Sequence, residues 1–451
     1  MNKIQLTRRQ FVTAASAGSL ALSSSRKAPA HEIMSGNAGK LAILGGTPVR
    51  QNKPWPEWPY WDDNVIDSIV KTTKSRIWCR IQSATGTVPT FEKKYARLMR
   101  TNYCVATGAG TQALHTCVEA LGIGAGDEII TSPYTDPGTL ASILASRALP
   151  VLADLDPESY QLDPEDVEKR ITRNTKAIMP VHIMGQPCHM SRIMEIAKKH
   201  NLKVIEDACQ AHLAEYKGKK LGTIGDLGCF SFQSSKTLAC GEGGAIIGND
   251  EKLMDMCYTV HNHGTSRRGL TEVAGPKYRM NELEAALLLG QMPGVEERFA
   301  RRNENASRIT SAIKGIPGVV PQKLYEGTGS GSFYIYGMTY KKEHFNDADR
   351  NRFLKAIAAE GIPLDLYIAQ GLHREPWIEN ILSSKLYQSM FSKERLRKYR
   401  EEKDCPNCDR VCRDVVIIWA SGPLIGTKED MDDVANAIIK VYENRDKLNS
   451  I

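Results

Sequence analysis

The sequence predicts an α/β protein with a mostly parallel β-sheet covered by helices on both faces, followed by a smaller C-terminal α+β domain. Apolar strand-like and helix-like segments alternate from about residue 100 to residue 210. Repeated β-α-β units of this kind build a parallel, right-handed sheet. After about residue 295 the strict alternation stops, which is typical of a separate α+β unit.

The expected elements of the sheet domain follow one another at short intervals. Strands are expected at 103–107, 128–132, 150–153, 177–181 and 203–206, and helices at 111–121, 139–146, from 163 onward, and at 190–200. The helix from 163 has the clearest start, because Asp163 can cap it and Pro164 suits its first position. In the smaller domain we expect helices at 295–314, 349–360 and 428–444, and strands at 333–340 and 415–419.

The chain divides into four predicted segments. These are an export signal at 1–30, an extended arm at 31–60, a large domain at 61–300 and a small domain at 301–451. The arm is rich in Gly, Pro and Trp and has no sustained hydrophobic period, which favours an extended path.

Residues 1–30 have the features of a twin-arginine export signal. Arg8 and Arg9 precede a weakly apolar stretch from Val12 to Leu22, and small residues flank a cleavage site near Ala30. The stretch is well short of the roughly twenty residues that a membrane span needs. We therefore expect an exported protein without a membrane span.

The charge distribution argues against a nucleic-acid partner. The net charge is +7, but residues 1–30 supply five of these charges and contain no acid, so the remaining chain carries only +2. Nucleic-acid binding needs basic residues massed on one face, whereas here they are scattered among nearly as many acids.

The eleven cysteines do not suggest a disulfide framework. Five of them lie in apolar runs, where a thiol usually serves as a small core side chain: Cys104, Cys117, Cys209, Cys229 and Cys257. Cys405, Cys408 and Cys412 form one cluster, but three ligands without a nearby fourth make a poor zinc site. We favour structural thiols over a local disulfide or a metal, and expect no metal.

Four segments carry the candidate chemistry, and each follows a predicted strand: 106–113, 204–210, 228–236 and 241–244. In the first, Gly108 and Gly110 lead into a helix whose N-terminus can hold a phosphate. The rival interpretation, a dinucleotide site, needs an acid at the end of the next strand, where the chain has Thr131-Ser132-Pro133. In the others, Asp207 ends a strand, and Lys236 stands between a Ser-rich strand end and three glycines, as a carbonyl-trapping amine would.

These residues resemble the pyridoxal-phosphate sugar aminotransferases of the DegT/DnrJ/StrS type, a fold type I family with a seven-stranded sheet. The likeness runs from about Gly45 to the C-terminus. Its core motifs stand here as Gly110-Thr111-Gln112-Ala113, Glu206-Asp207-Ala208-Cys209-Gln210, Ser231-Phe232-Gln233-Ser234-Ser235-Lys236 and Tyr278-Arg279-Met280-Asn281.

The resemblance implies a role for each motif residue. Lys236 would bond to pyridoxal phosphate and move the proton at the substrate carbon, while Asp207 would keep the pyridine nitrogen protonated. Gln210 would lie near the hydroxyl of the ring. Gly110, Thr111 and Ser231 would hold the phosphate.

Two departures from the family pattern concern cofactor binding. The family usually places an aromatic residue on the cofactor ring where this chain has Asp136, so either Tyr134 takes over or the ring is held differently. The family also commonly has Asn, reaching the phosphate of the neighbouring subunit, where this chain has Lys277. A lysine can still pair with phosphate as a point charge, and a homodimer with shared active sites is expected.

The resemblance also implies a reaction. We expect transfer of an amino group from glutamate or glutamine to a keto-sugar or cyclic ketone, with His182, Tyr336 and Tyr367 as candidate substrate residues. Tyr334 and His373 are further candidates. Partly buried aromatics of a small core are an equally good interpretation of these side chains. An alternative function is a saccharide-binding or sensory protein that keeps the cofactor without turnover.

Overall fold

The computed structural model describes residues 39–419 and 422–451. The predicted export signal at 1–30 and the start of the predicted arm lie outside the described residues. Among those described, no helix is both long and apolar enough to cross a membrane.

The large domain is built on a seven-stranded sheet, as the family resemblance implies. The strand order is β1 (Tyr103–Thr107), β9 (Gly244–Gly248), β8 (Leu227–Ser231), β5 (Lys203–Asp207), β4 (Thr175–Met179), β2 (Glu128–Thr131) and β3 (Leu149–Leu152). Only β9 runs antiparallel to its neighbours, and the other six strands are parallel. All five expected strands of the sheet domain are therefore present in a mostly parallel sheet.

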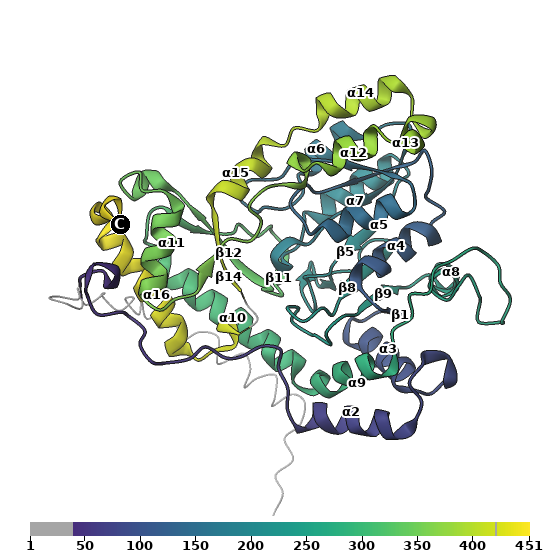
Figure 1. The fold of residues 1–451 in the computed structure, drawn as a ribbon, viewed down its shortest axis with the longest axis horizontal. Helices are drawn as coiled ribbons and strands as arrows, with labels where there is room; N and C mark the ends of the chain where they lie inside the picture. Colours follow the sequence, from purple (N-terminus) through teal and green to yellow (C-terminus); the bar gives the residue numbers. More distant parts are fainter. Residues whose placement is uncertain (1–38, 420–421) are drawn as a thin grey trace, which may run out of the picture.

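Helices cover both faces of this sheet (Figure 1). Alternating strand residues explain why: Ile129 packs into one core and its neighbour Ile130 into another. One core includes α4 (Gly110–Ala120), α5 (Pro137–Ala145) and α8 (Glu251–His261). The other includes α3 (Thr87–Leu98), α6 (Pro164–Arg170), α7 (Met190–Lys199) and α9 (Glu282–Gln291). Helix α2 (Asp63–Ser75) packs on α9.

The C-terminal part forms the predicted α+β unit. Its antiparallel sheet has the order β10 (Val319–Pro321), β12 (Ile335–Tyr340), β14 (Val415–Trp419) and β13 (Leu364–Asp365). Helices α10 (Val295–Ile313), α11 (Arg350–Ala359) and α16 (Lys428–Glu443) build its core. A small third sheet joins β11 (Thr328–Ser330), β6 (Glu215–Tyr216) and β7 (Lys219–Lys220).

The described part of the arm lies against this C-terminal unit. Leu41 is fully buried in its core, and Arg50 NH1 pairs with Asp430 Oδ1 at 2.7 Å. The domain boundary near residue 300 stays a prediction.

A helical excursion between β13 and β14 lies on the large sheet (Figure 1). It contains α12 (Trp377–Leu382), α13 (Lys385–Met390), α14 (Lys393–Glu402) and α15 (Pro406–Asp414). Tyr387 and Tyr399 donate hydrogen bonds to the carbonyls of Ala148 and Pro150, next to and within edge strand β3. These helices, which the sequence did not predict, cover that edge of the sheet.

The cysteine cluster lies in this excursion. Cys405, Cys408 and Cys412 are buried free thiols at and within α15. No group of three or more His, Cys, Asp or Glu side chains within residues 39–419 and 422–451 is arranged to hold a metal ion.

Candidate active site

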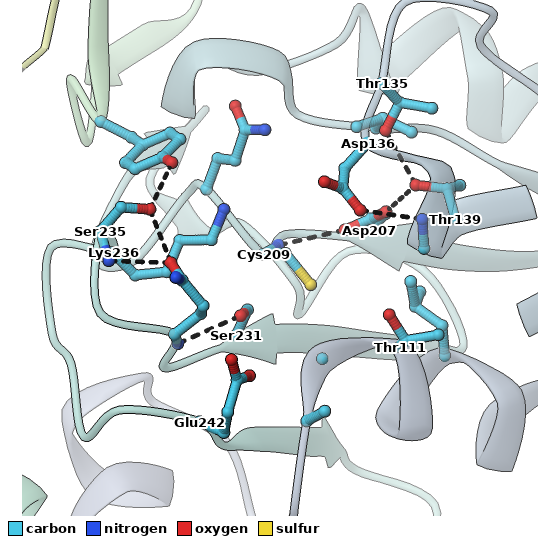
Figure 2. Close-up of a pocket in the computed structure, with 18 of the residues that line it drawn as sticks. Thr111, Thr135, Asp136, Thr139, Asp207, Cys209, Ser231, Ser235, Lys236 and Glu242 are labelled. Carbon is cyan, nitrogen blue, oxygen red and sulfur yellow. Dashed lines mark hydrogen bonds between the residues drawn. The ribbon is translucent and has the colours of Figure 1, made fainter. Parts of the chain in front are cut away.

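A cavity of about 440 Å³ lies at the carboxyl ends of the large-sheet strands, where open α/β sheets bind their ligands (Figure 2). Most of its wall comes from loops that follow β1, β2, β5 and β8. The C-terminal part of the chain adds three aromatic residues, Tyr334, Tyr367 and Trp419. The predicted residues Gly110, Thr111, Asp207, Gln210, Ser231, Lys236 and Tyr367 all line this one cavity.

One end of the cavity is suited to an anion. Helix α4 begins at Gly110, and its N-cap, Ala109, provides no side-chain hydrogen bond to the first turn. The first N–H groups of the helix therefore keep their capacity to bind a negative group, and the helix dipole favours it. A Cβ on Gly110 would lie 2.8 Å from Ser231 Cβ and 3.0 Å from Cys209 Sγ, so only glycine allows α4 to approach the end of β8 this closely.

Asp207 is a buried carboxylate fixed at the end of β5. Its Oδ2 accepts a hydrogen bond from Thr139 Oγ1 at 2.7 Å, and its Oδ1 accepts one from the Cys209 N–H at 3.2 Å. Thr139 lies in the first turn of α5 and is itself 2.8 Å from Thr135 Oγ1. No base within the described part of the chain forms an ion pair with Asp207, so its charge is available to a cationic group in the cavity.

Lys236 follows β8 in a loop whose hydrogen bonds aim its side chain into the cavity (Figure 2). Its Nζ lies 4.2 Å from the centre of the Tyr334 ring, a cation–π distance. The ring is fixed in turn by a 2.8 Å contact between the Tyr334 hydroxyl and Ser235 Oγ. Gln233 accepts from Ser235 Oγ through its side chain and from the Lys236 N–H through its backbone.

Gln210 joins the loop after β5 to the aromatic wall. Its Oε1 accepts from the Met184 N–H, and its Nε2 donates to the Tyr367 hydroxyl, each at 2.7 Å. Burial raises the pKa of Tyr367 above its ordinary value, so this hydroxyl is protonated at neutral pH and can donate a hydrogen bond into the cavity.

Two predicted substrate residues lie elsewhere. His182 is fully buried, and its Nδ1 accepts from the Cys188 N–H, which leaves Nε2 to donate to Glu206 Oε2 at 2.9 Å. Tyr336 is buried in the C-terminal core, with its hydroxyl 2.7 Å from Thr310 Oγ1. Neither lines the cavity, and both are held by internal partners.

Two predicted cofactor residues also lie outside the cavity wall. Tyr134 is only 1% exposed and meets the edge of Tyr367, with ring centroids 6.0 Å apart. Lys277 is exposed and pairs through its backbone with Asn262. Asp136 is exposed on the cavity wall and caps α5, because its Oδ1 accepts from the Gly138 N–H at 2.8 Å. Tyr134 therefore does not line the cavity itself, and its contact with the cofactor ring stays a prediction.

Sequence reasoning did not single out Thr139, Trp419 or Glu242, which line the cavity. Thr139 lies in a predicted helix, and Trp419 ends a predicted strand far along the chain. Glu242 belongs to the predicted segment 241–244, which the sequence analysis singled out for its three glycines and not for this carboxylate. Nothing local in the sequence marks these three side chains as part of the cavity that Lys236 lines.

The fold and the cavity together define a fold type I transferase, with a lysine and a buried aspartate at the carboxyl ends of a mostly parallel sheet. The sequence pattern of the DegT/DnrJ/EryC1/StrS aminotransferase family matches residues 79–439. This chain belongs to that family and is an aminotransferase.

Named relatives and solved structures agree with this membership. L-glutamine:2-deoxy-scyllo-inosose aminotransferase of Streptomyces kanamyceticus is 32% identical over 425 residues, which cover 90% of this chain and 98% of the relative. The crystal structure of 3-amino-5-hydroxybenzoic acid synthase has a TM-score of 0.75 at 26% identity and covers 87% of this chain and 99% of its own. The aminotransferase from Psychrobacter cryohalolentis has the same TM-score and coverages at 28% identity.

Proposed function

We propose that this protein is a pyridoxal-phosphate-dependent aminotransferase that moves the amino group of glutamine to a cyclic polyhydroxylated ketone. The observation that carries the proposal is the meeting of Lys236, Asp207 and the N-terminus of α4 around one cavity. Glutamine and the cyclic ketone come from the names of relatives such as the Streptomyces kanamyceticus enzyme. In the overall reaction, the ketone carbon receives the amino group and loses its oxygen as water, and the donor carbon takes its new carbonyl oxygen from water.

The cavity offers a matching group for each charged end of pyridoxal phosphate, the phosphate and the pyridine nitrogen. Gly110, Thr111 and Ser231 form a close anion cradle at the uncapped start of α4, which suits the phosphate. Asp207 provides a buried carboxylate for the pyridine nitrogen. When bound, the cofactor supplies an electron sink for the substrate carbon that carries the amine.

The protein's own groups then have distinct tasks. Lys236 Nζ would hold the cofactor, and its amine would move a proton to and from the substrate carbon. Asp207 Oδ2 keeps its orientation through Thr139 and holds the proton on the ring nitrogen. Tyr334 lies beneath the Lys236 amine and restricts where it can move.

The visible absorption spectrum of the purified mature protein tests this function. Wild type loaded with pyridoxal phosphate should show a band from the lysine-linked cofactor, which glutamine bleaches, and Lys236→Ala should lack it. A band that no amine alters would support the alternative of a saccharide-binding protein without turnover. Absence of any bound cofactor after incubation would refute the site assignment.

We further propose a homodimer in which Lys277 reaches the phosphate of the neighbouring subunit. Lys277 is exposed and away from its own cavity, as a residue serving another subunit would be. Mixing inactive Lys236→Ala with a Lys277→Ala variant should restore activity, because a mixed dimer would contain one site with both lysines. No restoration, with mixed dimers demonstrated by mass spectrometry, would contradict a shared site.

Export by the twin-arginine pathway is a third proposal, which rests on Arg8, Arg9 and the cleavage site near Ala30. Cell fractionation should find the shortened protein outside the cytoplasm. Replacing both arginines with lysine should keep the full-length protein inside. Equal distribution of the two forms would contradict the proposal.

A further inference from the structure

The described part of the arm reaches the loop that carries Lys236. Trp58 donates its indole N–H to the carbonyl oxygen of Ser234 at 2.9 Å, across 176 residues of sequence. Among the described residues, no other group donates to this carbonyl. Trp58 does not line the active-site cavity. It therefore contacts this loop from outside the cavity, whereas Tyr334 contacts the Lys236 amine from within.

The Ser234 carbonyl belongs to the peptide group that joins Ser234 to Ser235, just before Lys236. The N–H of this peptide group donates to Gln233 Oε1 at 2.8 Å, within the loop itself. The next peptide group is also held from within, because the Lys236 N–H donates to Gln233 O at 2.8 Å. Trp58 ties the backbone of this part of the loop to a distant segment of the chain. Because peptide groups are planar and each residue has only two soft dihedral angles, fixing this carbonyl restricts the direction in which the Lys236 side chain leaves the backbone.

Trp58 is itself held by α10. The Arg302 guanidinium lies 5.4 Å from the centre of the Trp58 ring, and that of Arg298, about one helical turn earlier, lies 4.2 Å from the centre of the Tyr60 ring. Arg302 is only 1% exposed, so this support for the indole is part of the interior. The arm thus runs along α10 on its way to α2 (Figure 1).

We propose that Trp58 is a positioning residue for the proton transfer that Lys236 performs. By fixing the Ser234 carbonyl, it keeps the Lys236 amine on its path to the substrate carbon. The inference rests on the proposed aminotransferase reaction and adds to it a residue outside the cavity. Because Trp58 does not line the cavity, its loss should slow the proton transfer without weakening the binding of the donor.

Trp58→Phe tests the proposal, with Trp55→Phe as the matched control. Phenylalanine keeps an aromatic ring beside Arg302 but has no N–H to donate. Trp55 also lies in the arm and also donates its indole N–H to a backbone carbonyl, that of Gly361 at 3.4 Å. Gly361 follows α11 in the C-terminal unit and does not belong to the loop of Lys236. The two substitutions are therefore the same chemical change at two places in one arm.

The first readout needs no cofactor. Hydrogen exchange of the cofactor-free protein is followed by mass spectrometry on peptides that cover residues 231–241. Exchange there should be about two- to tenfold faster in Trp58→Phe than in wild type, the size expected when one hydrogen bond is lost. Trp55→Phe should exchange there as wild type does. Should Trp58→Phe unfold, benzothienylalanine at position 58 takes its place, because it has sulfur instead of the indole N–H and keeps the bicyclic ring.

The second readout is the rate at which glutamine bleaches the cofactor band in a single turnover. In Trp58→Phe the rate at saturating glutamine should fall about two- to tenfold, with the half-saturating concentration unchanged. Trp55→Phe should keep the wild-type rate. Glutamine deuterated at its α-carbon should slow Trp58→Phe at least as much as it slows wild type, because the impaired step is the proton transfer.

Four results overturn the proposal: wild-type exchange in residues 231–241 of Trp58→Phe, a wild-type bleaching rate, a smaller isotope effect than in wild type, or the same changes in Trp55→Phe. A wild-type band that glutamine does not bleach would instead count against the proposed function. In that case the exchange readout still decides whether Trp58 holds the loop of Lys236.

Discussion

Glu206→Gln should destabilise the protein strongly although Glu206 lies outside the cavity. Its carboxylate is fully buried and accepts four hydrogen bonds. Oε1 accepts from the N–H groups of Ile224 and Gly225 at 2.6 and 2.7 Å. Oε2 accepts from His182 Nε2 at 2.9 Å and from the Gly222 N–H at 2.8 Å. These bonds fix the loop that leads into β8, the strand that carries Ser231.

The magnitude follows from this bonding pattern. In glutamine one of these two oxygens is replaced by an amide nitrogen, which donates and cannot accept. Whichever position it takes, two donors face it and two hydrogen bonds are lost. Each buried group left unsatisfied costs about 1–3 kcal/mol, so the free energy of unfolding should fall by about 2–6 kcal/mol.

Equilibrium urea unfolding of the cofactor-free protein measures this loss. Glu165→Gln is the control, because Glu165 is exposed and pairs with Arg192 on the surface; such pairs contribute little to stability. If Glu206→Gln unfolded at the same urea concentration as wild type, the structural role assigned to His182 and Glu206 would be refuted.

Two other predictions concern cofactor binding and pH. Gly110→Ala should weaken pyridoxal-phosphate binding and lower the free energy of unfolding by about 1–3 kcal/mol, because its Cβ would overlap Ser231. Cofactor titration and urea unfolding measure the two effects, and Gly315→Ala, whose Cβ would have nothing within 4 Å, should show neither. Equal cofactor affinity of Gly110→Ala and wild type would contradict the anion cradle. Burial lowers the pKa of His212 from its ordinary 6.5 to about 4. Between pH 6.5 and pH 4, His212 is therefore protonated in the unfolded chain and neutral in the folded protein. Stability should therefore fall by about 2 kcal/mol from this group between pH 7 and pH 5. His212→Gln should flatten the decline, which buried His261 shares; an unchanged slope would contradict the assignment.

The sequence predicted the fold class and most of one wall of the cavity, but not the helical excursion between β13 and β14. The alternation of strand-like and helix-like segments predicted the parallel strands; Asp207 and Ser231 each end a strand of the sheet, and Lys236 follows one. The carboxyl ends of parallel strands meet at one sheet edge, so residues far apart in the chain could be expected to meet there.

The opposite wall could be predicted only in part, because Tyr334 and Tyr367 were among the candidate residues and Trp419 was not, and the limit is a physical one. Tyr334, Tyr367 and Trp419 come from the C-terminal part of the chain, and their meeting with Lys236 depends on how two cores pack together. His182 also follows a strand, and no local pattern distinguishes a residue that faces the cavity from one that turns away to bind Glu206. Strand ends thus predict where a site lies better than which side chains face it.

The helical excursion between β13 and β14 limits how the cavity can open. Tyr367 follows β13 at the start of the excursion, and Trp419 is the last residue of β14, which pairs with β13. The middle of the excursion is held on the large sheet by Tyr387 and Tyr399. A hinge rotation of the C-terminal unit would have to break these two hydrogen bonds or move edge strand β3 together with the unit. We therefore expect such a rotation to cost the hydrogen bonds of Tyr387 and Tyr399 with the sheet edge, which favours substrate entry without it.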